Sequence, residues 1–275
     1  MLKWIGILTM VIDHIAVYFD EWLSPTVYTL MRLVGRLSFP IFCYFLALGF
    51  RRTSNLLMYF VRLVGFAGLS QIFFEWGHRF IGMPSYGPNV LFTFATGLVF
   101  LSGYALMSKS WRDVLMRVQP VEGDSRGAGA YHVRVNFGGY TLDPKAGFAL
   151  GVVMLVAAFV TTILYDLEYG LYGLFMIWAF YYVQDREAAD RERKCYLVMS
   201  ILHAVFYIGF LIAPSVFPYF SEIQIAALAT IPIIYGLMPE TKRQSKPSAA
   251  RKYFFYVFYP LHLVALMLIR WLILN

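Results

Sequence analysis

Apolar residues fall along this chain in nine long runs separated by shorter polar connectors. The runs cover residues 3–22, 29–50, 57–74, 89–107, 147–165, 168–183, 196–213, 221–238 and 254–274. Most of them approach the ~20 residues of helix that cross the ~30 Å hydrocarbon core of a bilayer. The pattern predicts an all-α, polytopic transmembrane helical bundle of about nine spans, built as a single domain over residues 1–275.

Composition agrees with this class. Hydrophobic residues make up 60% of the chain and charged residues only 14%, and the mean hydropathy is +0.62. A soluble protein of 275 residues needs more charge to cover its surface, which excludes that class. The first run has no small-residue cleavage site after it, so we expect a retained membrane helix rather than a signal peptide. Cys43 and Cys195 show no metal-ligand or redox spacing, and we expect no metal.

Basic residues are concentrated on alternate connectors. Residues 51–55, 108–146, 184–194 and 239–252 contain nearly all the Lys and Arg of the loops, whereas the other connectors contain only Arg79. Because cytoplasmic loops are rich in Lys and Arg, this alternation predicts a cytoplasmic N-terminus and a C-terminus outside. The net charge of +7 is therefore mostly a signal of topology, and we expect no nucleic-acid partner.

The connector at 108–146 is unlike the others and forms a cytoplasmic insertion. Its residues 131–137, YHVRVNF, alternate polar with β-branched or aromatic residues between Gly-rich turns. Such alternation predicts a short strand or β-hairpin. His132 lies in this loop and is not counted as catalytic.

Charged and polar residues inside the first two runs are the strongest candidates for chemistry. Asp13 and His14 lie in the middle of the first run, where their cost in lipid means that they face a protein interior and usually mark a site. Arg32 and Arg36 share one helical face of the second run. With Pro25 at the turn, His14 and Arg36 lie at matching depth. We expect Asp13 to pair with Arg32 or Arg36.

Two further histidines are predicted near the same depth. His203 and His262 each lie about 8–9 residues from the nearest inner boundary, or ~13 Å of helix, and His14 about 11 residues, or ~16 Å. A lone membrane histidine is often a hydrogen-bonded packing residue, and this interpretation is favoured for His203. Supporting polar residues are Tyr259 beside His262, Glu75 at the outer end of the third run, and Asn89 at the start of the fourth.

Three arginines lie on the predicted inner side: Arg51, Arg52 and Arg62. They obey the positive-inside rule, and that alone explains them. They are also suitable ligands for phosphate groups.

Several segments, in order along the chain, resemble one family. The segments are IGILTMVIDHIA, MRLVGRLSFPIFCYFLALGFRRTSN, YFVRLVGFAGLSQIFFEWG, NVLFTFATGL, the turn of Asp166 to Gly170, and FFYVFYPLHL. Together they resemble the TraX family of bacterial membrane proteins, although residues 110–146 are not part of its pattern. The resemblance implies a multi-pass protein of the bacterial inner (plasma) membrane, in contact with membrane lipid.

The family is associated with N-terminal acetylation of conjugative pilin. It is similar to a broader superfamily of membrane acetyltransferases that take acetyl-CoA from the cytosol and use a histidine of the first spans. The resemblance therefore implicates His14, with Asp13, Arg36 and His262 as supporting residues, and acetyl-CoA as the donor.

The residues suit such a reaction. His14 would take the proton of an amine or hydroxyl acceptor, or form an acetyl-histidine intermediate. Arg36 would stabilise the oxyanion, and Arg51, Arg52 and Arg62 would hold the phosphates of CoA. Glu75 and Asp166, at the outer mouth, would attract a cationic amine.

Two other functions stay open on the sequence. The Asp-His-Arg set could serve as the relay of a transporter or proton-coupled channel. The chain could also be a non-catalytic membrane assembly protein. The acceptor, a peptide amine or a glycan, the acyl chain length and the oligomeric state are left open.

Overall fold

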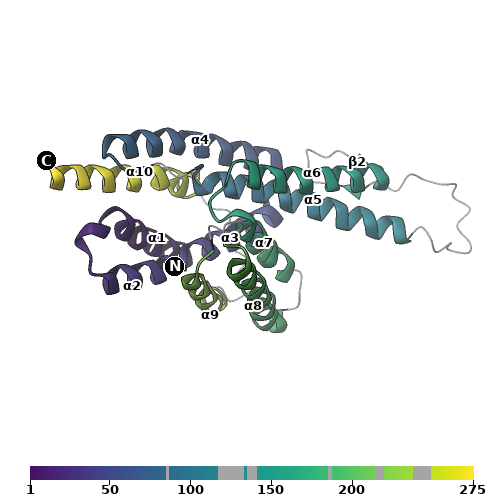
Figure 1. Cartoon of the computed structure of the whole chain (residues 1–275). Coiled ribbons are helices and arrows are strands. Elements are labelled where there is room, and N and C mark those ends of the chain that lie inside the picture. The colour runs from purple at the N-terminus through teal and green to yellow at the C-terminus, as the bar shows by residue number, and fades with distance from the viewer. Residues whose placement is uncertain (85–86, 117–132, 135–140, 185–187, 215–219, 238–248) are drawn as a thin grey trace, which may run out of the picture.

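The computed structural model describes residues 1–84, 87–116, 133–134, 141–184, 188–214, 220–237 and 249–275, and these are mostly helical, as expected (Figure 1). The α-helices are α1 (Leu2–Tyr18), α2 (Pro25–Gly35), α3 (Ser38–Arg52), α4 (Leu56–Phe80), α5 (Val90–Met116), α6 (Pro144–Leu164), α7 (Gly170–Val183), α8 (Ala188–Ile212), α9 (Thr230–Leu237) and α10 (Ala249–Leu274). Two 3₁₀ helices, η1 (Asp20–Trp22) and η2 (Glu222–Ala229), complete the helical elements of the described residues.

Among the described residues, six helical segments are long and apolar enough to cross a membrane, which supports a multi-pass membrane protein. They are Pro25–Arg52, Leu56–Phe80, Val90–Arg112, Pro144–Leu164, Asp190–Ile212 and Tyr253–Leu274. The expected nine full spans are thus corrected to six by this criterion. α7 has 14 residues and rises only ~21 Å, less than the ~30 Å core, and Glu222–Leu237 is also short. α1 has 17 residues. The orientation of the termini stays a prediction.

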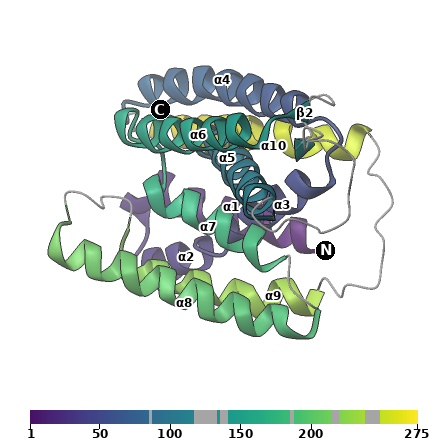
Figure 2. The same ribbon diagram turned by 90° about the vertical axis from the view of Figure 1, so that its right-hand side faces the viewer.

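The helices form two sides around a central group (Figures 1 and 2). α4, α6 and α10 lie on one side, α8 and α9 lie on the other, and α1, α3 and α7 lie between them. α3 packs against α1 and α7, and α10 packs against α4 and α1. This arrangement brings the first and last helices of the chain side by side.

Large apolar side chains cover the outward faces of the peripheral helices. On α4 they include Leu57, Ile72 and Trp76, and on α8 Leu197 and Ile208, each more than half exposed. Runs of exposed apolar residues of this length are unfavourable in water but match the hydrocarbon of a bilayer. Cys43 and Cys195 are free and buried, as expected of packing residues.

α5 and α6 form a long antiparallel hairpin in which backbones approach closely. A Cβ atom on Gly103 would lie 2.8 Å from the carbonyl oxygen of Gly151, and one on Gly151 would lie 2.7 Å from the backbone nitrogen of Met107. Gly147 meets Ser110 one turn further along. Small residues allow membrane helices to pack in this way, and packing contacts replace the hydrophobic effect as the driving force.

We therefore expect Gly151→Ala to destabilise the fold by about 1–3 kcal/mol, because the added methyl group overpacks an interface made of backbone. The matched control is Gly65→Ala on α4, where a Cβ atom meets nothing within 4 Å. Unfolding of both variants in the same detergent measures the difference. Equal stability of the two variants would show that the close approach has no energetic role.

The expected short hairpin is present in the insertion. Strand β1 (Val133–Arg134) pairs antiparallel with strand β2 (Thr141–Leu142), with Val133 opposite Leu142. The other residues of 131–137, including His132, lie outside the described residues, as does most of 108–146.

Candidate functional site

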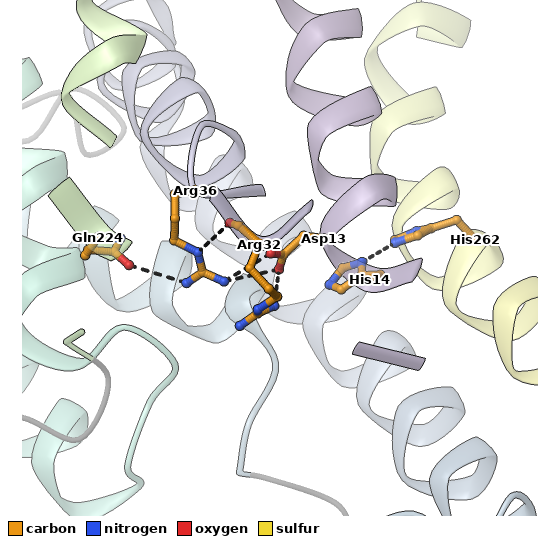
Figure 3. A network of polar contacts seen from close by, with 6 residues as sticks. All are labelled: Asp13, His14, Arg32, Arg36, Gln224 and His262. Carbon is orange, nitrogen blue, oxygen red and sulfur yellow. Dashed lines mark hydrogen bonds and ion pairs between the residues drawn. The ribbon is translucent and has the colours of Figure 1, made fainter. Parts of the chain in front are cut away.

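A largely buried ion-pair cluster joins α1 to α2. Asp13 accepts hydrogen bonds from Arg32 Nη1 at 2.7 Å and from Arg36 Nη2 at 3.1 Å (Figure 3). A Cβ atom on Gly35 would overlap the Asp13 carboxyl group, so the absence of a side chain at Gly35 is what lets α2 approach the acid. The expectation that Asp13 pairs with Arg32 or Arg36 agrees with this geometry, since it pairs with both. Two guanidinium groups thus share one carboxylate.

The cluster continues into the middle of the protein. Arg36 Nη1 donates to Gln224 Oε1 at 3.3 Å, and Gln224 Nε2 donates to the Tyr172 hydroxyl oxygen at 3.5 Å. Gln224 lies in η2 and is fully buried. The Tyr172 hydroxyl in turn donates to His203 Nε2 at 2.9 Å. A chain of polar contacts therefore runs from α1 through η2 and α7 to α8.

Three buried histidines have the same backbone arrangement. Each donates its Nδ1–H to the carbonyl oxygen four residues earlier: His78 to Phe74 at 2.7 Å, His203 to Met199 at 2.7 Å, and His262 to Phe258 at 3.0 Å. In a neutral imidazole one nitrogen donates and the other accepts. The Nε2 atom of each of these rings is therefore an acceptor.

His14 differs from those three because its Nδ1 atom meets another histidine. Nδ1 of His14 lies 2.7 Å from Nε2 of His262, and the rings are 5.0 Å apart between centroids. Because His262 Nε2 accepts, His14 Nδ1 must donate. Nε2 of His14 then keeps its lone pair, and Figure 3 shows it directed away from His262. A neutral imidazole held in this tautomer can act as a base or a nucleophile.

The structure brings together four of the predicted site residues in two neighbouring groups: Asp13 with Arg36, and His14 with His262. Tyr259, one turn before His262 on α10, has its ring centroid 5.7 Å from that of His262. His203 is not in this group; it is hydrogen-bonded and buried against Tyr172.

The predicted outer residues Glu75 and Asn89 belong to a hydrogen-bonded group separate from the histidine pair. Asn89 donates to the Ala67 carbonyl oxygen and to Gln71 Oε1, and Gln71 Nε2 donates to Glu75 Oε1 at 3.0 Å. Asn89 also accepts from the backbone N–H of Leu91 at the start of α5. These two residues tie α4 to α5, and none of their hydrogen bonds reaches His14.

The predicted phosphate ligands separate into different surroundings. Arg51 donates to the Tyr181 carbonyl oxygen at 3.0 Å and lies over the Tyr181 ring, so it joins α3 to α7. Arg52 is exposed. Arg62 lies over the Tyr59 ring, with its guanidinium carbon 5.8 Å from the centroid, and beside the Tyr256 hydroxyl.

Sequence reasoning missed Gln224, Tyr172 and Glu168. Gln224 and Tyr172 look like ordinary residues of apolar runs, and no local pattern marks them. Glu168 had a signal, since it lies in a very short connector, but the sequence predicts only its neighbour Asp166 as an acid at the outer mouth. In the part of the chain that the structure describes, no group of three or more His, Cys, Asp or Glu is placed to hold a metal ion.

Comparisons with known proteins give one family and one relative. A family model described as "TraX protein" matches residues 1–270. The chain is 36% identical over 110 residues to "Probable fimbrial assembly protein FimC, serogroup H1" of Dichelobacter nodosus; the match covers 36% of this chain and 43% of that protein. The chain thus spans less than half the length of that relative. No solved structure matches the chain.

Proposed function

Because the chain belongs to the TraX family, we propose that it is a membrane acetyltransferase that moves an acetyl group from cytosolic acetyl-CoA to an amine or hydroxyl acceptor. The observation that supports this best is the pair of histidines. His262 fixes the tautomer of His14 so that the Nε2 lone pair of His14 is available. A purely structural histidine would be expected to use both nitrogens, as His203 does.

The proposed reaction is direct transfer. Nε2 of His14 takes the proton of the acceptor N–H or O–H as the acceptor attacks the thioester carbonyl carbon. The imidazolium that forms still donates from Nδ1 to His262, which disperses its charge. When the tetrahedral intermediate collapses, the C–S bond breaks and the proton passes from His14 to the CoA thiolate. The products are the acetylated acceptor and the CoA thiol.

Arg32 is better placed than Arg36 to stabilise the oxyanion. The Arg36 nitrogens already donate to the Arg32 carbonyl oxygen, to Gln224 and to Asp13. Among the described residues, the hydrogen bonds of Arg32 use only Nη1. Both guanidinium groups are within electrostatic range of His14. The spare donors of Arg32 can therefore meet the developing negative charge, with Asp13 holding the side chain in place.

The donor is proposed to enter at the first turns of α10. There Arg62 and Tyr256 lie beside each other, and the Lys3 ammonium is 4.7 Å from the Phe255 ring centroid. Cationic side chains bind phosphates, and aromatic rings stack on bases. This site lies about six residues, or ~9 Å of helix, from His262, so an extended arm can join it to His14.

Arg62→Ala is expected to weaken acetyl-CoA binding about tenfold, because a charge-assisted contact to phosphate is lost. Calorimetry on the full chain in detergent measures this. The control is Arg79→Ala at the other end of α4, where the side chain is exposed; it should bind like the wild type. No saturable binding by a folded wild-type protein would remove the enzyme proposal.

A non-catalytic assembly role is the second candidate, favoured by the printed name of the fimbrial relative. It predicts that pilus assembly in cells continues normally with His14→Ala and that acetyl-CoA does not bind. Loss of acetylation with His14→Ala, in a protein that still reaches the membrane in normal amount, would favour the enzyme.

A further inference from the structure

Glu168 lies in a connector that points it into the protein. The connector between α6 and α7 contains Asp166 at φ 48° and Tyr169 at φ 63°; aspartate tolerates this left-handed conformation, but it is costly for a bulky residue such as Tyr169. The Tyr169 ring stacks on Phe39, 3.7 Å between centroids, and Thr93 Oγ1 donates to the Glu168 carbonyl oxygen at 2.7 Å. The strained turn is thus held between α3 and α5. Strain kept by such contacts often marks a functional position.

The Glu168 carboxylate faces the site described above. It lies against the backbone N–H of Val90, the first residue of α5, where a helix favours negative charge. In the described part of the chain, no Arg, Lys or His forms an ion pair with it. The titratable groups within electrostatic range are Asp13, Arg32, Arg36, Tyr18, Tyr169 and Tyr259.

This carboxylate is set to exchange a proton near neutral pH. Burial raises the pKa of Glu168 to about 7, and the Asp13 charge adds to the rise, while Arg36, Arg32 and the Val90 N–H oppose it. Most glutamates have a pKa near 4.3 and stay ionised at neutral pH. The pKa of Glu168 is therefore suited to a general base that works near neutral pH.

An amine acceptor needs a second base. A primary ammonium and acetyl-CoA give an amide, the CoA thiol and one free proton. The nitrogen loses two protons, of which His14 carries one to the thiolate. The other must leave before the attack, because an ammonium group has no lone pair.

We propose that Glu168 takes this first proton: it binds the ammonium group of the acceptor and delivers a neutral amine to the thioester beside His14. A hydroxyl acceptor is already uncharged and loses only one proton, so it does not need Glu168. This inference rests on the proposed acetyltransferase function, and it assigns binding of the acceptor ammonium to an acid in the connector between α6 and α7.

The test compares two acceptor probes in the full-length protein. One is an apolar peptide amide with a free N-terminal amine, and the other is the same peptide with a hydroxyl group in place of the amine. In Glu168→Gln, acetyl transfer to the amine should fall about tenfold at pH 7 and stay within about twofold of wild type at pH 9, where most α-amines, with pKa about 7.7–8.0, are neutral. Transfer to the hydroxyl should stay within about twofold at both pH values.

The pH profile gives a readout that a merely structural role would not move. Transfer to the amine should rise with a midpoint near 7 in wild type and near the pKa of the amine itself in Glu168→Gln. The matched control is Glu222→Gln, an exposed acid at the start of η2, which should keep the wild-type midpoint. As a readout independent of activity, a protonated-carboxyl infrared band should titrate near pH 7 in wild type and be absent from Glu168→Gln.

The possible failures can be told apart. Equal losses on the amine and hydroxyl probes, or an unchanged midpoint with the amine, would overturn the role of Glu168 and leave the acetyltransferase intact. A wild-type protein that transfers acetyl to neither probe would overturn both.

Discussion

His14→Ala is expected to lower the rate of acetyl transfer at least about 100-fold, the contribution typical of a general base, while acetyl-CoA binds within about twofold of wild type. The reason is local: the contact with His262 makes Nδ1 of His14 the donor, and no described residue hydrogen-bonds to Nε2 of His14. Purified protein, radiolabelled acetyl-CoA and either acceptor probe suffice for the measurement.

Two other histidine variants make this result specific. His203→Gln keeps an acceptor for the Tyr172 hydroxyl, and its rate should stay within about threefold of wild type. His262→Phe leaves the His14 ring in place but removes the acceptor for Nδ1, so the rate should fall about tenfold, between the other two. More than a tenth of wild-type transfer by His14→Ala would rule out this histidine as the base.

Asp13→Ala is expected to destabilise the protein by about 3 kcal/mol, because it leaves the buried guanidinium group of Arg36 and the half-buried one of Arg32 without their carboxylate. The side chains of Asp13 and Arg36 are 15% and 9% exposed, so water can do little to compensate. Unfolding in detergent, followed by helix content, measures the effect.

The control breaks an ion pair of similar length at the surface. Asp190 Oδ2 lies 2.6 Å from Lys194 Nζ, but both side chains are exposed, and Asp190→Ala should leave the unfolding midpoint unchanged. Adding Arg32→Met and Arg36→Met to Asp13→Ala should recover part of the loss, since the apolar side chains need no carboxylate, although Gln224 then loses the donor Arg36. Wild-type stability of Asp13→Ala alone would mean that the cluster is solvated.

The parts of the site that the sequence predicts are those that depend on helical geometry alone. Counting residues from Pro25 places His14 level with Arg36, and the i, i+4 spacing puts Arg32 and Arg36 on the face that reaches Asp13. At a mid-membrane position an unpaired charge is costly, so Asp13 is expected to pair with these arginines. The helical class follows in the same way from the length of the apolar runs.

The rest depends on how distant segments pack. Gln224 reaches Arg36 only because η2 enters the protein beside α2, and nothing near Gln224 in sequence indicates this. Glu168 lies in a connector, where an acid is ordinarily assigned to solvent, and a strained turn brings it inward. The predicted number of full spans was too high because an apolar run does not distinguish a helix that faces lipid from one packed inside the protein. α7 is of the second kind, since most of its residues are buried against other helices.

The contact between Gly35 and Asp13 has a consequence for how such sequences diverge. A side chain at position 35 would occupy the space of the Asp13 carboxyl group. Substitutions at positions 13 and 35 are therefore expected to occur together. A lineage that replaces Gly35 is expected to have lost the acid at 13 as well, and with it the constraint on both arginines. Co-variation of these positions across relatives would therefore separate chains that keep the ion-pair cluster from those that keep only the fold.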